Sequence, residues 1–288
     1  MLTFNNPTTV EEAVALLQKT DSRQRVLAGG TDLLVQLRSG RIQAQGVVDL
    51  KRIPELRTIR TENGGFRIGA AVSGAELGEH PALSTMWPGV IEGARLIGST
   101  QIQGRASLGG NVCNASPAAD GVPGLIAAGA TCTIVGPGGR RVVAVDAIAV
   151  SPGKTSLAPG EFVVDFFLPA QAAKGGDAYL RFIPRTEMDI AVVGAAVNLV
   201  LDASGVCTHA RVALGAVAPR ALLVEAASHA LVGTRVEAAA LEALAAAARA
   251  ACAPINDKRG TIEFRTQVAG VLAKRAALIA YERARSRA

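Results

Sequence analysis

The sequence predicts an α+β fold in which two N-terminal α/β units are followed by a separate C-terminal α/β domain. Helix-like and strand-like segments alternate along the chain, two glycine-rich segments interrupt them, and the composition shifts after Gly175-Gly176. These observations place the units at residues 1–57, 58–173 and 174–288. A chain of 288 residues is long enough to bury cores of this kind.

The first unit is expected to hold two helices and two short strands. Val10 to Leu17 carries apolar residues at helical spacing, and Arg25 to Ala28 is a short apolar strand that ends at a pair of glycines. Asp32 to Arg38 resumes the helical pattern. Val47 to Leu50 then forms the second strand.

The second unit contains an uncharged stretch of 19 residues, Gly121 to Gly139, which is long enough to raise the question of a membrane span. Its glycines and prolines would break such a helix repeatedly, so we expect a buried helix, a buried strand and a hairpin turn. The other elements expected in this unit are strands at Phe66 to Ala70 and Glu161 to Leu168, helices from Gly74 and at Trp87 to Ile97, and a hairpin of Thr131 to Val135 with Arg141 to Val145.

In the C-terminal domain, Ala191 to Leu201 and Ala210 to Val217 are predicted as strands, and Val236 to Cys252 and Thr266 to Arg283 as helices. Basic residues gather near the end of the last helix, where the helix dipole favours them, and are expected to be solvated. They are Arg275, Arg283, Arg285 and Arg287.

Composition excludes several classes of protein. With 49% apolar and 19% charged residues the chain is not disordered. Its net charge of +6 is scattered and only 3% of residues are aromatic, so no nucleic-acid partner is expected. The N-terminus lacks a basic region followed by an apolar stretch, which makes the cytoplasm the expected location.

The four cysteines are dispersed, and none has a second cysteine or a histidine at metal-ligand spacing. They are Cys113, Cys132, Cys207 and Cys252. We therefore expect no metal site and no iron–sulfur cluster on this chain, and we interpret the cysteines as isolated buried thiols.

The first candidate site is the segment that follows the first predicted strand. Two glycines after a strand allow a tight turn whose N–H groups point outward and can bind phosphate oxygens. The segment fits neither the GxGxxG nor the GxxxxGK[ST] pattern. Its residues are Val26, Leu27, Ala28, Gly29, Gly30, Thr31, Asp32 and Leu33.

The second candidate site is Ala106 to Asp120, a polar, glycine-containing segment without amphipathic periodicity. Apolar segments flank it and should hold it inside the fold, where its backbone groups need polar partners. We therefore expect a loop that binds something polar. An ordinary surface loop is the alternative.

The two segments together, in this order and separation, resemble the FAD-binding segments of molybdenum hydroxylase flavoproteins of the xanthine and carbon monoxide dehydrogenase type. The matching stretches are Ala28 to Thr31, Ser107 to Asn111 and Ala115 to Asp120. A third stretch, Tyr179 to Ala191, resembles the start of that family's C-terminal domain. The resemblance extends over essentially the whole chain.

The resemblance implies a vanillyl-alcohol-oxidase-type fold, with FAD bound non-covalently between two α/β subdomains and followed by a flavoprotein domain of three strands and helices. Val26 to Leu33 with Gly109 and Gly110 would wrap the diphosphate of FAD. Side-chain contacts would come from Ser107, Asn111, Asn114, Ser116 and Asp120, whereas Ile97 and Val163 would lie near the isoalloxazine ring. Where some relatives have a cofactor-contacting lysine, this chain is expected to have Ile183.

The resemblance further implies an electron-transfer subunit. Electrons would arrive from [2Fe-2S] clusters on a small partner subunit, after substrate oxidation at molybdopterin on a large subunit, in a dimer of heterotrimers. No acid/base residue is nominated on this chain. Two alternatives stay open, a self-contained FAD oxidase or reductase on the same fold and a non-catalytic scaffold that has lost the cofactor.

Overall fold

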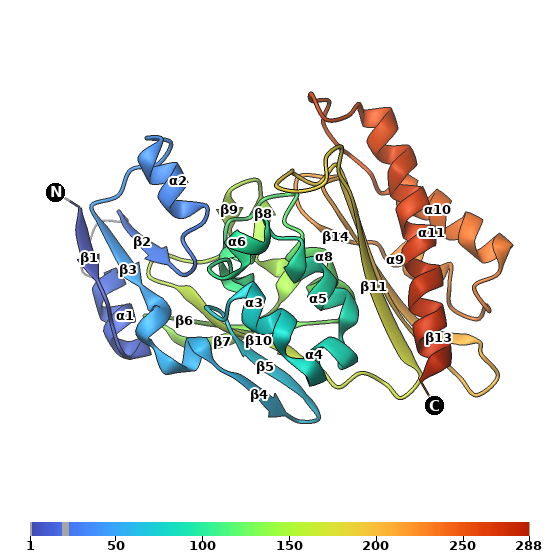
Figure 1. The fold of residues 1–288 in the computed structure, drawn as a ribbon, viewed down its shortest axis with the longest axis horizontal. Helices are drawn as coiled ribbons and strands as arrows, with labels where there is room; N and C mark the ends of the chain where they lie inside the picture. Colours follow the sequence, from blue (N-terminus) through green and yellow to red (C-terminus); the bar gives the residue numbers. More distant parts are fainter. Residues whose placement is uncertain (1, 19–22, 288) are drawn as a thin grey trace.

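The computed structural model describes residues 2–18 and 23–287 and arranges them as three units along the long axis of the molecule (Figure 1). Each unit has its own sheet, and the C-terminal sheet lies at the opposite end of the molecule from the N-terminal one. The α+β class predicted from the sequence is confirmed. No helix in the described ranges is long and apolar enough to cross a membrane.

The N-terminal unit is a parallel three-stranded sheet in the order β1-β3-β2. Its helices α1 and α2 connect these parallel strands, which a tight hairpin could not join. Both predicted helices and both predicted strands are present. The sequence did not indicate β1, which has three largely exposed residues and so no readable pattern. The bounds are β1 Thr3–Asn5, α1 Val10–Gln18, β2 Gln24–Leu27, α2 Leu33–Arg38 and β3 Gly46–Asp49.

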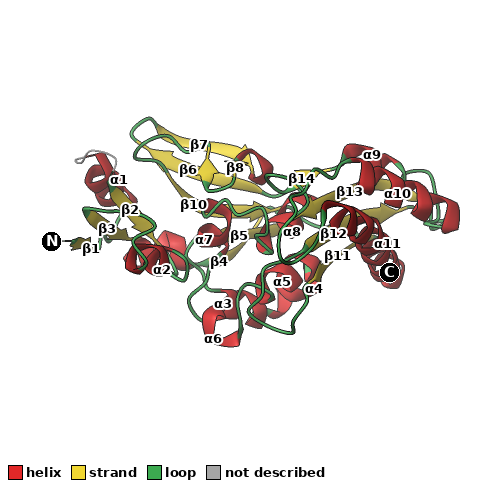
Figure 2. Ribbon diagram, turned by 90° about the horizontal axis from the view of Figure 1, so that it is seen from above, coloured by secondary structure: helices red, strands yellow, loops and turns green. Residues whose placement is uncertain are grey.

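The central unit is an antiparallel sheet in the order β4-β5-β10-β6-β7. Figure 2 shows α3, α5 and α6 together on one side of it. The bounds are β4 Ile59–Glu62, β5 Gly65–Gly69, α3 Gly74–Glu79, α4 Pro81–Met86, α5 Pro88–Arg95, α6 Thr100–Gln103, α7 Leu108–Cys113, α8 Gly121–Ala127, β6 Thr131–Gly136, β7 Gly139–Ala144, β8 Ala149–Ser151, β9 Lys154–Thr155 and β10 Phe162–Leu168, with 3₁₀ turns η1 Leu50–Arg52, η2 Pro54–Arg57 and η3 Val145–Ala147.

The buried helix, buried strand and hairpin expected in the uncharged stretch are confirmed as α8, β6 and the β6–β7 turn. The helix expected at Trp87 to Ile97 is confirmed as α5, which runs from Pro88 to Arg95, because proline suits a first helical turn and Gly98, with φ +68°, lies soon after its end. One expectation was wrong: the second candidate segment is not entirely loop, since it contains α7.

The C-terminal unit is an antiparallel sheet in the order β11-β12-β13-β14, and α11 packs along β11 and β12. The resemblance implied three strands; the fourth, β14, has two residues. The bounds are β11 Gly175–Phe182, β12 Val193–Leu201, β13 Cys207–Gly215, β14 Leu222–Leu223, α9 Glu225–His229, α10 Ala238–Ala250 and α11 Ile262–Ser286.

Two further expectations for this unit need correction. Gly175 and Gly176 are the first two residues of β11 rather than a break: a Cβ at Gly176 would be 2.2 Å from the Ala280 carbonyl oxygen, so glycine lets α11 approach the strand. Arg283 and Arg287 are not simply solvated. Arg283 donates to the Asp177 carbonyl at 2.7 Å, and Arg287 donates to the Gly175 carbonyl at 2.9 Å, so both fasten the end of α11.

Candidate cofactor-binding site

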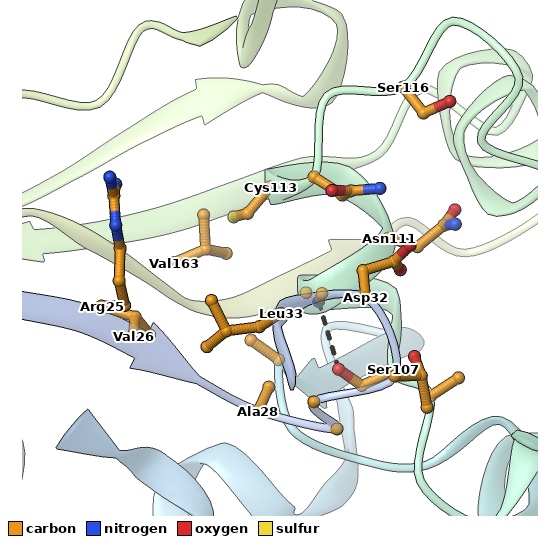
Figure 3. Close-up of a pocket in the computed structure, with 18 of the residues that line it drawn as sticks. Arg25, Val26, Ala28, Asp32, Leu33, Ser107, Asn111, Cys113, Ser116 and Val163 are labelled. Atoms are coloured by element: carbon orange, nitrogen blue, oxygen red, sulfur yellow. Dashed lines mark hydrogen bonds between the residues drawn. The ribbon is translucent and has the colours of Figure 1, made fainter. Parts of the chain in front are cut away.

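A cavity of about 720 Å³ lies where the N-terminal unit faces the central unit (Figure 3). This volume is in the upper part of the range of roughly 300–1,000 Å³ for small-molecule sites. The turn between β2 and α2 forms one wall, and α7 with β10 forms another. All the residues predicted for the site line the cavity except Leu27 and Asp120; the lining ones are Val26, Ala28, Gly29, Gly30, Thr31, Asp32, Leu33, Ile97, Ser107, Gly109, Gly110, Asn111, Asn114, Ser116 and Val163.

The β2–α2 turn presents a row of free backbone donors to this cavity. Among the described residues, none accepts a hydrogen bond from the N–H groups of the five consecutive residues Gly29 to Leu33. Gly30 has φ +80°, a left-handed conformation that favours glycine. A Cβ at Gly29 would lie 2.1 Å from the Arg105 carbonyl oxygen, so the turn also packs against the central unit. Successive N–H groups of this kind bind anionic oxygens.

The opposite wall is α7, which Ser107 caps by accepting a hydrogen bond from the Gly110 N–H at 3.1 Å. Leu108 and Val112 are buried at helical spacing, which the intervening glycines and asparagine obscured in the sequence. The two glycines differ. A Cβ at Gly109 would lie 2.4 Å from the Ala70 carbonyl oxygen, whereas one at Gly110 would meet only Ser107 Oγ, at 3.5 Å.

A direct contact joins the two walls. The Gln36 side chain on α2 donates to Asn114 Oδ1 at 3.2 Å, and Asn111 Oδ1 accepts from the Gly121 N–H at 3.0 Å. One asparagine therefore links α2 to α7, and the other ties α7 to the start of α8. Sequence reasoning missed Gln36, because a lone glutamine on an exposed helix carries no signal.

Further lining residues that sequence reasoning missed include two arginines and a glutamate. Arg25 and Arg41 have no ion pair with a described residue, whereas Glu161 pairs with Arg141 at 2.7 Å. Cys113 also lines the cavity, and burial raises the pKa of its thiol to about 12, which keeps it protonated. Partial desolvation raises the pKa of Asp32 above its ordinary value, although the residue as a whole is exposed.

The structure gives Asp120 different partners from those expected. Its carboxylate is buried outside the cavity lining, where it accepts hydrogen bonds from Tyr179 Oη and Arg181 Nη1, both at 2.8 Å. Burial raises the pKa of Asp120, although Arg181 and Tyr179 act in the opposite direction. Arg181 also donates to the Leu96 carbonyl at 2.8 Å, next to the lining residue Ile97. Leu27 is buried beneath the turn.

The C-terminal unit contributes little else to the walls. Ile190 lines the cavity, whereas Ile183 does not. From the C-terminal unit, Arg181 on β11, two residues before Ile183, reaches the Leu96 carbonyl beside the cavity. No group of three potential metal ligands is present in residues 2–18 and 23–287. The arrangement combines anion-binding N–H groups, a few polar side chains and apolar surface, which suits a phosphate-bearing ligand with a planar ring.

Comparisons with known proteins agree with this chemistry. Residues 1–171 match the family described as the FAD binding domain in molybdopterin dehydrogenase, and residues 178–280 match the CO dehydrogenase flavoprotein C-terminal domain. The chain is 36% identical to the carbon monoxide dehydrogenase medium chain of Hydrogenophaga pseudoflava over 281 residues, 97% of each protein. It is 30% identical over 274 residues to the xanthine dehydrogenase FAD-binding subunit of Escherichia coli O157:H7, covering 94% of this chain and 93% of that one.

Solved structures show the same likeness. A chain of the carbon monoxide dehydrogenase from Hydrogenophaga pseudoflava superposes with a TM-score of 0.94 and 37% identity, covering 98% of both chains. A chain of quinoline 2-oxidoreductase from Pseudomonas putida 86 gives a TM-score of 0.91 at 27% identity, with 99% of this chain and 98% of that chain covered.

Proposed function

This chain belongs to the family of FAD-binding subunits of molybdenum hydroxylases, and on that premise we propose that it binds FAD non-covalently in this cavity. We further propose that it transfers electrons from iron–sulfur clusters on a partner subunit to an external acceptor. As in its relatives, the chain is a subunit of an oxidoreductase. Bound FAD supplies the redox chemistry, because a flavin takes up and releases electrons singly or in pairs.

The observation that carries the proposal is the row of free N–H groups from Gly29 to Leu33, which lies in the same cavity as α7. A diphosphate needs several donors at close range, and five backbone N–H groups meet that need without a charged side chain. Gly110 leaves the facing wall open, because a Cβ there would meet only one side-chain atom within 4 Å. The residues present therefore fit an extended dinucleotide.

The protein's own contribution is binding and orientation. The Gly29 to Leu33 N–H groups would hold the diphosphate, and Asn111, Asn114 and Ser116 would contact its polar linkage. Val163 on β10 and Ile97 provide apolar surface for a flat ring. With Cys113 held as a neutral thiol, we assign no acid or base to this wall.

We further propose that the partners are a molybdenum-binding large subunit and an iron–sulfur small subunit, assembled as a dimer of heterotrimers. The support is the similarity to proteins named as a medium chain and as an FAD-binding subunit, names that imply other chains. We also propose units at residues 1–57, 58–173 and 174–288, each of which contains one of the three large sheets.

The test combines cofactor content with reconstitution. The purified chain should be yellow, and acid should release FAD rather than FMN; a colourless chain that does not take up added FAD would refute the proposal. Substrate should bleach the flavin only after both partner subunits are added. Bleaching in partner-free protein would instead support the self-contained oxidase or reductase.

A further inference from the structure

The β2–α2 turn is held from outside the cavity by one side chain, Lys51. Its ammonium group donates to the Ala28 carbonyl oxygen at 2.8 Å and to Asp49 Oδ1 at 2.6 Å. Asp49 ends β3 and is the register partner of Leu27 at the end of β2. Lys51 therefore ties the carboxyl ends of two neighbouring parallel strands to the start of the turn.

This contact fixes a peptide plane that faces the cavity. The Ala28 carbonyl and the Gly29 N–H belong to the same peptide group, in which a trans bond points them in opposite directions. Because Lys51 holds the carbonyl oxygen on one side, the Gly29 N–H is directed to the other. The row of free donors from Gly29 to Leu33 begins with this N–H group.

Lys51 can influence the turn without contacting a ligand in the cavity. Its side chain is 21% exposed and that of Asp49 is 12% exposed, so water competes only partly for the contact. Lys51 is not part of the cavity lining. On the other side, the Arg105 backbone packs against Gly29, so the turn is held from two directions.

We propose that Lys51 is a positioning residue that preorients the Gly29 to Leu33 N–H groups for the diphosphate of the flavin nucleotide. The inference rests on the proposed function, because it concerns how the same cavity holds FAD. Donors that are already oriented need no ordering when the ligand binds, and this increases affinity. The effect should be confined to ligands that carry the diphosphate.

The test compares the full-length parent with K51M, K51R and the control K154M, which alters an exposed lysine on β9. Binding of FAD, ADP and riboflavin to flavin-free protein is measured by calorimetry, together with the melting temperature. We expect K51M to bind FAD and ADP about tenfold more weakly, the scale of one lost charged hydrogen bond. Its riboflavin affinity should match that of the parent, and its melting temperature should fall modestly because the buried Asp49 loses its cation. K51R should regain most of the FAD affinity, and K154M should be unchanged.

Two results would overturn the role of Lys51: equal FAD affinity in K51M and the parent, or an equal loss for FAD and riboflavin, which would indicate general damage to the fold. If K51M does not fold, D49N carries the test, because it removes the partner that fixes the lysine and should weaken FAD and ADP binding alone. A parent that binds neither FAD nor ADP would refute the proposed function itself.

Discussion

Replacing Asp177 by Asn should remove much of the pH dependence of stability. Asp177 on β11 is 3% exposed, and its Oδ2 accepts a hydrogen bond from the Gly89 N–H at 2.8 Å. No described residue is hydrogen-bonded to Oδ1. Burial raises the pKa of this carboxyl to about 7, with a smaller contribution from Glu92 in the same direction, while Arg283 and Arg287 lower it.

The sign of the effect follows from the raised pKa. In the unfolded chain the carboxyl ionises near its ordinary value of 3.8, whereas in the folded protein it keeps its proton until about pH 7. The stability it contributes is therefore complete below pH 3.8 and is lost as the pH rises through 7. A change of one in pKa is worth about 1.4 kcal/mol, so the total is about 4 kcal/mol, of which about 3 kcal/mol falls between pH 5 and 8.

Urea denaturation of the parent and Asp177→Asn at pH 5, 6, 7 and 8 would measure this. The difference between their free energies of unfolding should shift by about 3 kcal/mol in favour of the variant as the pH rises. The amide also leaves a polar atom without a partner, but that cost is the same at every pH. Parallel curves for the two proteins would show that Asp177 is already ionised in the folded state.

Three further substitutions test the site and its supports. Gly29→Ala should lower both the melting temperature and FAD affinity, because its Cβ would lie 2.1 Å from a backbone oxygen; thermal unfolding with and without FAD would show this. Gly110→Val should fold like the parent, with an unchanged circular dichroism spectrum, yet lose most of its flavin; full flavin content would place the ligand elsewhere. Arg181→Met should lower the free energy of unfolding by about 3–5 kcal/mol, because it leaves the buried Asp120 carboxylate without its cation. A free energy of unfolding from urea denaturation that lies within about 1 kcal/mol of the parent, the scale of an exposed ion pair, would contradict this.

Elements with a long repeating pattern could be predicted from the sequence. Val10 to Leu17 and Val236 to Cys252 show helical spacing, and both form helices close to those limits. The helix α7 was missed because its four central positions hold two glycines, an asparagine and only one apolar residue, Val112. Gly175-Gly176 was misinterpreted because glycine usually interrupts a strand, whereas here it admits the backbone of α11.

The two glycine pairs of the candidate site could be predicted from the residues alone, and the resemblance added most of the side chains that line the cavity. Glycine pairs after a strand have a recognisable geometric reason, so the turn and the Gly109-Gly110 pair were visible in the sequence. Gln36 joins the cavity walls and Lys51 supports the turn from outside through side-chain hydrogen bonds that no local pattern reveals. Asp120 looked like its polar neighbours, because its partner Arg181 lies 61 residues further along the chain.

The cavity is bounded by separate units, so its shape depends on how those units are held together. On the N-terminal side, α2 has no buried residue, and Gln36 provides its hydrogen bond to Asn114 on the facing wall. On the C-terminal side, Arg181 connects β11 to the Leu96 carbonyl beside the cavity. A ligand that contacts both walls adds links that the free chain lacks, and thermodynamic linkage requires it to stabilise the arrangement it binds. Substitutions that loosen either connection should therefore weaken FAD binding, and a substitution of Arg181 should do so although that residue does not line the cavity.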